Sequence, residues 1–213
     1  MAKGGDLSNF AMTPEHIRLL ADHDPEKRGQ AAHDLFSAGL SRALDSMQEW
    51  ERDVELRGLL ARHNVESLPA AFPPVAKVTV GLAVLPETFE KIRAAHGSPP
   101  LADAPADQDV LEFELEFKDI GMSYVRLDIL TTKAPGAGGA IARFLEKFGE
   151  GIQQVELDVT DVDRATEILR TRFHLQPVYP ATRPGANGTR VNFFLVTARN
   201  NQKVLVELVE QPS

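Results

Sequence analysis

The chain has 213 residues, of which 43% are hydrophobic and 25% charged, a composition typical of a globular protein. It contains no cysteine, so disulfides, thiolate nucleophiles and zinc–thiolate clusters are excluded, and any metal must bind His, Asp, Glu or Gln. The net charge of -8 is spread along the chain without a basic stripe, so we expect no nucleic-acid partner. Neither a long apolar run nor a signal-peptide pattern is present, so we expect no membrane partner and a cytoplasmic location.

Residues 1–70 are predicted to be helical. Thr13-Pro14 and Asp24-Pro25 each place an N-cap residue before a proline, which marks two helix starts. Beyond the second start, apolar residues recur at helical spacing, which predicts one long amphipathic helix or a broken pair of helices with Gly39 and Gly58 as candidate breaks. These apolar residues are Leu35, Phe36, Leu40, Leu44, Met47, Val54, Leu59 and Leu60.

A linker is predicted over Val65–Pro74, because three prolines there remove amide donors and stop helix propagation. We therefore expect a helical N-terminal region over residues 1–70 and a second domain over 74–213.

The second domain is predicted to contain a repeated unit. Beyond the linker, the apolar period changes from that of a helix to that of a strand, and the order of strand, helix and further strands occurs over about 75–133 and again over about 150–211. The expected segments are a strand at 78–84, a helix at 87–95, a hairpin of 110–117 with 123–130, a strand at 152–159, a helix at 161–173 capped by Thr160, and strands near 177–179, at 190–196 and at 203–210. The predicted fold class is α+β, with an N-terminal helical segment followed by paired βαβββ units that form a curved mixed sheet around a cavity.

Two features of the strands leave alternatives open. The strand 110–117 places four apolar side chains on one face and Glu112, Glu114 and Glu116 on the other, and this acidic row suits either a solvated face or a catalytic group. The glycines of the loop 184–188 suit either a phosphate contact or a turn that needs positive φ.

Three stretches carry a family likeness: Gly81–Val84, the run FLEKFGEGIQQVELDV over Phe144–Val159, and GANGTRVNFFLV with KVLVELVEQ over Gly185–Gln211. Together they resemble a vicinal-oxygen-chelate domain of the methylmalonyl-CoA epimerase type, over about residues 74–211. The resemblance implies a divalent metal held by two histidines and two carboxylate or amide ligands, which stabilises an enolate while acidic groups move the α-proton.

The metal-ligand places implied by the resemblance are Thr79, Asp128, Gln154 and Glu207. Both expected histidines are therefore replaced, one by Thr79 and one by Gln154. The remaining oxygen ligands suit hard cations such as Mg, Ca or Mn better than Co or Zn. The only cofactor left open is a divalent cation (Mg, Mn or Co). Asp128 and Glu207 are the candidate catalytic residues, as ligands or as proton-transfer groups.

Strand periodicity alone adds further candidates for ligand binding. If Asp128 and Glu207 face a cavity, residues two positions away face it too: Arg126, Leu205, Lys77 beside Thr79, and Glu156 beside Gln154. We therefore hypothesise that Lys77 or Arg126 takes the electrostatic role of the lost metal, since clustered carboxylates without a counter-charge would protonate.

Three functions follow from these features. The first is a glyoxalase/bleomycin-resistance-like protein with a degenerate metal site, which binds a small molecule or acyl-CoA with weak or no epimerase activity. The second is an active metal-assisted isomerase (epimerase) or lyase. The third is a non-catalytic assembly or regulatory protein. A homodimer is the expected assembly, as the commonest symmetric one.

Overall fold

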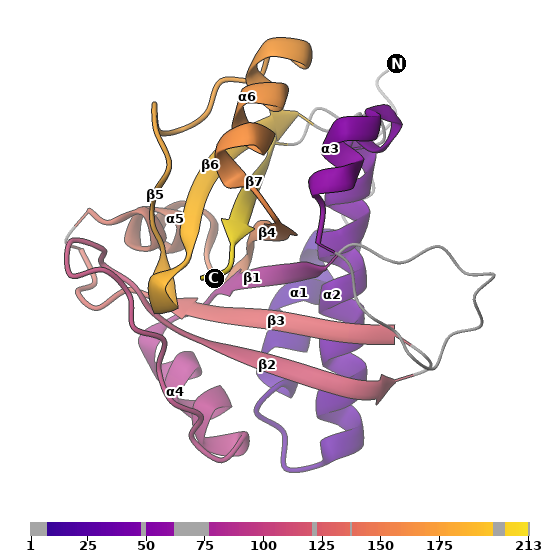
Figure 1. Ribbon diagram of the computed structural model, residues 1–213. Coiled ribbons are helices and arrows are strands. Elements are labelled where there is room, and N and C mark those ends of the chain that lie inside the picture. The colour runs from indigo at the N-terminus through magenta and orange to yellow at the C-terminus, as the bar shows by residue number, and fades with distance from the viewer. Residues whose placement is uncertain are drawn as a thin grey trace, which may run out of the picture. The chain divides into compact units, whose positions relative to one another are not determined.

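The computed structural model describes residues 8–47, 50–61, 77–120, 123–136, 138–197 and 203–212 (Figure 1). The predicted linker Val65–Pro74 lies outside the described residues. The chain forms two compact units, and each is described by itself below. Unit 1 comprises Met1–Gly39 and Val80–Gln153, and unit 2 comprises Leu40–Thr79 and Gln154–Ser213.

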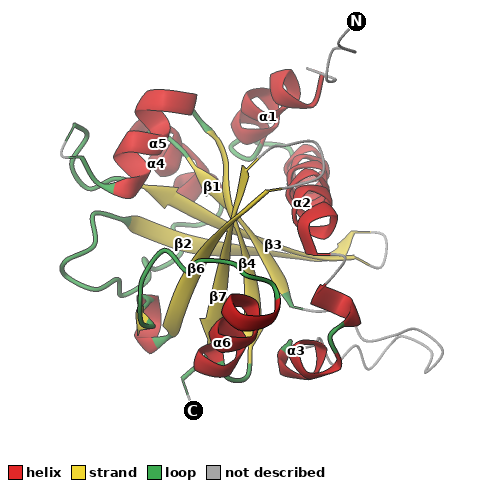
Figure 2. Cartoon of the chain, turned by 90° about the horizontal axis from the view of Figure 1, so that it is seen from above, coloured by secondary structure: helices red, strands yellow, loops and turns green. Residues whose placement is uncertain are grey.

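An N-terminal helical part is followed by strands with helices between some of them, which confirms the predicted α+β class (Figure 2). The helices are α1 (Ser8–Leu19), α2 (Pro25–Met47), η1 (Trp50–Arg52), α3 (Val54–Leu59), α4 (Pro86–Ala95), α5 (Ala140–Phe148), α6 (Val162–Arg172) and η2 (Ala186–Gly188). The strands are β1 (Val78–Ala83), β2 (Leu111–Ile120), β3 (Ser123–Thr131), β4 (Gly151–Val159), β5 (Arg183–Pro184), β6 (Arg190–Thr197) and β7 (Lys203–Glu210). Among the described residues, none of these helices is long and apolar enough to cross a bilayer.

The predicted internal repeat is visible in the strand pairing. In unit 1, β1 lies parallel to β3, and β2 lies antiparallel to β3. In unit 2, β4 lies parallel to β7, and β6 lies antiparallel to β7. Each repeat therefore pairs its first strand with its last, and α4 and α6 occupy the same place in the two repeats. The strands belong to one seven-stranded sheet, which is mixed, as predicted.

The N-terminal helices belong to the core of unit 1. Ile17 of α1 and Ala31, Ala32 and Leu35 of α2 are buried in one cluster with the apolar faces of β1, β2 and β3. The strand residues of this cluster are Val80, Leu82, Phe113, Leu115, Val125, Leu127 and Ile129. The shared core of the N-terminal helices and β1–β3 does not show whether residues 74–213 fold alone. The predicted domain boundary therefore stays a prediction.

Gly39 does not break α2, contrary to prediction, and the helix continues to Met47. A Cβ on Gly39 would lie 2.6 Å from both methyl groups of Val80 on β1. Glycine is therefore required here by a close approach of helix to strand, and not by a turn. The alternative of a broken helical region is confirmed further along, where η1 and α3 follow α2.

Four further predictions about local structure are corrected. Pro14 lies inside α1 instead of at its start, because proline costs a helix one hydrogen bond without always ending it. The N-cap of α6 is Asp161 and not Thr160: the Asp161 carboxylate accepts from the amide of Arg164 at 2.8 Å. Helix α5 was not predicted, and the strand expected near 177–179 is only a bridge from Pro177 to Phe194.

One face of the unit 2 sheet is covered by α6, which contacts β6 and β7 (Figure 1). The sheet contributes Val155, Leu157, Phe194, Val206 and Leu208 to this buried face, and α6 contributes Val162, Ala165, Ile168 and Leu169. Because neighbouring strand residues alternate between faces, the opposite face carries the other half of each strand.

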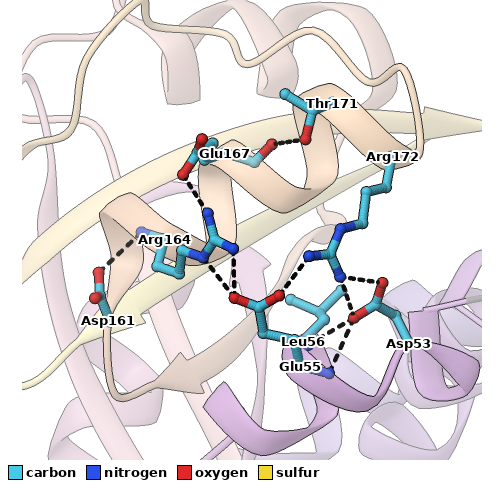
Figure 3. A network of polar contacts seen from close by, with 8 residues as sticks. All are labelled: Asp53, Glu55, Leu56, Asp161, Arg164, Glu167, Thr171 and Arg172. Atoms are coloured by element: carbon cyan, nitrogen blue, oxygen red, sulfur yellow. Dashed lines mark hydrogen bonds and ion pairs between the residues drawn. The ribbon is translucent and has the colours of Figure 1, made fainter.

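Helix α3 is attached to α6 by a network of ion pairs (Figure 3). Arg172 donates to both oxygens of Asp53, at 3.0 and 2.7 Å, and also to Glu55. Arg164 donates to Glu55 at 2.6 Å. Asp53 also caps α3, accepting from the amide of Leu56 at 3.0 Å. A helix this short is not stable alone, so docking on α6 and formation of α3 are coupled.

This network predicts acid-sensitive docking of α3. The amide of Leu56 and then Arg172 lower the pKa of Asp53, and Arg164 and Arg172 lower the pKa of Glu55. Because the pKa values of both carboxyl groups are lower in the folded state than in the unfolded state, their ion pairs stabilise the docked α3 fully above the unfolded pKa values. This stabilisation is lost as the pH falls through the folded pKa values, here below about pH 4. Trp50, the only tryptophan, packs edge-on against Phe173 and is 4% exposed, so its fluorescence reports the docking.

We expect Arg172→Ala to red-shift Trp50 emission at neutral pH, and the difference from the unsubstituted protein to shrink as pH falls below about 4. Arg170→Ala on the same helix is the matched control and should leave the emission unchanged. A difference that stays constant down to low pH would contradict the acidic partners assigned to Arg172.

Candidate functional site

On the face of the unit 2 sheet opposite α6, two cross-strand rows contain residues singled out in the sequence. In the first row, Glu156 of β4 lies beside Glu207 of β7, which lies beside Phe193 of β6. The second row, one pleat along, comprises Gln154, Leu205 and Leu195. We call this the ligand face. Each row starts with a polar residue on β4 and ends with an apolar residue on β6, so the face is polar at one side and apolar at the other.

The polar side of the ligand face is a buried hydrogen-bonded cluster. Gln154 Nε2 donates to Glu207 Oε2 at 2.6 Å and to Glu156 Oε1 at 3.1 Å. The three residues are 7%, 8% and 9% exposed for Gln154, Glu207 and Glu156 respectively. Burial of carboxylates is costly unless donors compensate, and the Gln154 amide serves two of them at once. The structure thus brings together three of the residues singled out in the sequence.

On the apolar side of the ligand face, Leu205 was expected from its place beside Glu207, whereas Phe193 and Leu195 were missed by sequence reasoning. Leu195 is 49% exposed, and Leu205 and Phe193 are half-buried. Tyr179 packs edge-on against Phe193 with ring centroids 5.9 Å apart, and the guanidinium of Arg183 lies 4.6 Å from the centre of the Tyr179 ring. Phe193 and Leu195 are found only through the register between β6 and β7, which alternation along a single strand does not give.

Lys77 and Thr79 also belong to unit 2. The amide of Lys77 donates to Ala61 at 2.8 Å, and its carbonyl accepts from Asp158 of β4 at 3.2 Å. Thr79 is buried within β1, at 1% exposure. The backbone therefore fixes Lys77 beside the end of β4, and the assignment of both residues to ligand binding stays a prediction.

Asp128 and Arg126 lie on β3 of unit 1, on the face opposite its apolar core. Arg126 donates to both oxygens of Glu114, at 3.2 and 3.0 Å, and its Nε lies 3.8 Å from Glu116. Glu114 stands opposite Asp128 in the β2–β3 register. The ion pairs described for Arg126 are therefore with the acidic row of β2, and the hypothesis that it replaces the metal stays untested.

Two groups on this face of unit 1 have shifted pKa values. Burial, and then the neighbouring charge of Glu114, raise the pKa of Glu112 to about 6, with Lys133 opposing. Burial and a hydrogen bond with Glu116 raise the pKa of Tyr124 to about 12. Glu112 is thus partly protonated near pH 6, where an ordinary glutamate is almost fully ionised.

The residues of the ligand face do not fit an imidazole-bound metal. Strands β1, β3, β4 and β7 contain no histidine. No group of three or more His, Cys, Asp or Glu residues able to hold a metal occurs within the described parts of the chain. The Gln154 amide donates to one oxygen of Glu156 and one oxygen of Glu207, so both carboxylates have a hydrogen-bond donor in this cluster.

The glycines of the loop 184–188 are explained by backbone geometry. Asn187 and Gly188 have φ of 52° and 77°, and a Cβ on Gly185 would collide with Thr189 and Val191. The turn alternative therefore accounts for this loop.

No family model and no curated protein matches the chain. Among solved structures, methylmalonyl-CoA epimerase from Mycobacterium tuberculosis is 26% identical with a TM-score of 0.51, and the match covers 71% of this chain and 97% of that one. A variant of the Streptomyces coelicolor epimerase in complex with 2-nitronate-propionyl-CoA is 25% identical with a TM-score of 0.51, covering 63% and 96%. The chain has the fold of the vicinal-oxygen-chelate superfamily.

The vicinal-oxygen-chelate match covers nearly the whole length of those epimerases but leaves part of this chain unmatched. The predicted superfamily is confirmed. The ligand places implied by the resemblance, and with them the loss of both histidines, remain predictions that the following proposal takes up.

Proposed function

We propose that the protein binds a small molecule on a vicinal-oxygen-chelate scaffold without a metal, and has weak or no epimerase activity. The observation that carries the proposal is the Gln154 amide that joins Glu156 and Glu207 within hydrogen-bond distance. In an epimerase of this type, a cation would bind the substrate oxygens and stabilise the enolate. Here an amide satisfies the carboxylates, so the folded state does not need a cation at this position.

Two ligand classes are to be tested first, one suggested by the similar solved structures and one by the side chains of the ligand face. The Streptomyces coelicolor structure contains 2-nitronate-propionyl-CoA, which makes acyl-CoA one candidate. The apolar side of the ligand face makes a smaller amphiphilic molecule the other. A homodimer and a cytoplasmic location complete the proposal, as expected from the sequence.

Metal content and proton exchange test this proposal directly. We expect elemental analysis of the purified protein, before and after incubation with Mg, Mn or Co, to show well below one metal per chain. We also expect no exchange of the α-proton of methylmalonyl-CoA in deuterated buffer, measured by NMR. One metal per chain, lost in Glu207→Ala but kept in Glu210→Ala, would overturn the proposal and favour an enzyme.

A second candidate function is an isomerase or lyase that uses an oxygen-bound divalent metal. The raised pKa of Glu112 favours it, because a group that titrates near pH 6 suits proton transfer. α-Proton exchange that requires added metal and disappears in Glu112→Gln would support this alternative.

A further inference from the structure

We propose that residues 77–213 carry an interaction surface whose partner is the N-terminal helical segment 8–61 of the same chain. The segment is held by noncovalent contacts in each of the two units, and it stays bound when the chain is cut between Ala61 and Lys77. It is therefore an intramolecular partner of the vicinal-oxygen-chelate scaffold and not a domain that folds apart from it. The contacts described below include none of the ligand-face residues, so the docking is independent of the small-molecule binding proposed above.

In unit 1, the segment fills part of the hydrophobic core. Ile17 and Leu20 are completely buried and Leu35 is 2% exposed, in one cluster with residues of β1, β2, β3 and α4. His96, which follows α4, donates through Nε2 to the carbonyl of Leu20 at 3.0 Å. Removal of α1 and α2 would expose the apolar face of these strands to water, at a cost in free energy that grows with the apolar area.

In unit 2, the segment is held by side chains and by the backbone. Leu56 of α3 and Trp50 of η1 are 1% and 4% exposed. The ion pairs between α3 and α6 surround Leu56 (Figure 3). Leu60, directly after α3, forms an antiparallel bridge with Val159 of β4. The attachment thus combines apolar burial, charge and backbone pairing.

Both ends of the intervening stretch 62–76 are fixed at β4. The amide of Ala61 donates to the carbonyl of Asp158 at 2.8 Å, and the amide of Lys77 donates to the carbonyl of Ala61 at 2.8 Å. The carbonyl of Lys77 in turn accepts from the amide of Asp158 at 3.2 Å. These backbone hydrogen bonds do not require the covalent connection, so a cut between Ala61 and Lys77 leaves them in place.

A cut chain tests the proposal. A site for a sequence-specific protease is inserted between Ala61 and Lys77, and the folded protein is cleaved to completion. We expect the two pieces to elute together in size-exclusion chromatography, at the volume of the uncut chain. The melting temperature of the cut protein should rise more steeply with protein concentration than that of the uncut chain, because docking of the segment has become bimolecular.

Two pairs of variants assign the contacts. Dissociation is measured as the rate at which cut protein exchanges its N-terminal piece with an excess of cut protein labelled on that piece. Leu56→Ala should raise this rate by at least about 30-fold, whereas Val54→Ala, at a position of α3 that is 72% exposed, should leave it unchanged. Gly39→Ala, whose Cβ would meet Val80, should raise the rate by about 5- to 150-fold, and Gly58→Ala should not.

The outcomes that would overturn the proposal are distinct. Separation of the two pieces on the column under native conditions would do so, whether the larger piece stays in solution or precipitates. Co-elution with the same exchange rate in all four variants would do so too, because the pieces would then be joined by other contacts. Circular dichroism of the uncut variants, unchanged by the substitutions, would show that faster exchange comes from weaker docking and not from unfolding.

Discussion

Cobalt binding is expected to appear when Thr79 and Gln154 are both replaced by histidine. Imidazole prefers cobalt and zinc, whereas a neutral threonine hydroxyl is a poor ligand. The Gln154→His change also removes the amide that now donates to Glu156 and Glu207, which frees carboxylate oxygens for a cation. We expect the affinity for cobalt to rise by at least on the order of 100-fold, because even second-shell changes at metal sites cost 10–100-fold. Cobalt titration followed by visible absorption measures this gain.

The single substitutions and Glu207→Ala are the controls for this gain of metal. Each single histidine variant should bind cobalt far more weakly than the double variant, and adding Glu207→Ala to the double variant should remove the site. Circular dichroism must first show that the double variant is folded, because Thr79 is almost fully buried. A folded double variant that binds no cobalt would show that the ligand places carried over from the epimerase family are wrong.

The second large effect is expected at Gly39. A Cβ there would lie 2.6 Å from both methyl groups of Val80, so Gly39→Ala forces either the helix or the strand to move. We expect a loss of about 1–3 kcal/mol in the free energy of unfolding, the usual cost of overpacking a core, which exceeds the gain in helix propensity of alanine over glycine. Urea denaturation followed by circular dichroism measures this loss.

Gly58 provides the matched control for Gly39. It also lies in a helix, but a Cβ there would have no atom within 4 Å. Gly58→Ala is therefore expected to be neutral or to stabilise by roughly 0.5–1 kcal/mol. In a double variant, Val80→Ala should offset part of the cost of Gly39→Ala, because the two positions are in contact. Strictly additive effects would contradict the close approach of α2 and β1.

Local sequence patterns were sufficient to predict the repeated unit. Alternation of apolar residues located β1, β4, β6 and β7, and the faces of β2 are as predicted: Phe113 and Leu115 lie in the core, whereas Glu114 and Glu116 are exposed. Helix starts were less reliable. Pro25 begins α2 as expected, but Pro14 lies inside α1, since a proline motif at a helix start also fits an internal position.

The candidate site was predictable only in part. The family resemblance pointed to Gln154 and Glu207, strand alternation added Glu156 beside Gln154, and the structure shows the three residues hydrogen-bonded. It could not say that Arg126 pairs with Glu114, because that contact depends on the register between β2 and β3. The same limit concealed Phe193, whose relevance follows only from its register with Glu207.

The sequence by itself determined which residues form strands, which face of each strand is polar, and the order of the two repeated units, because these depend on the alternation of neighbouring residues along the chain. Only the tertiary structure decided which polar residues meet across strands, why Gly39 must be glycine, and how α3 is held to α6. These properties depend on strand register and on the approach of segments far apart in the sequence, which no local pattern encodes.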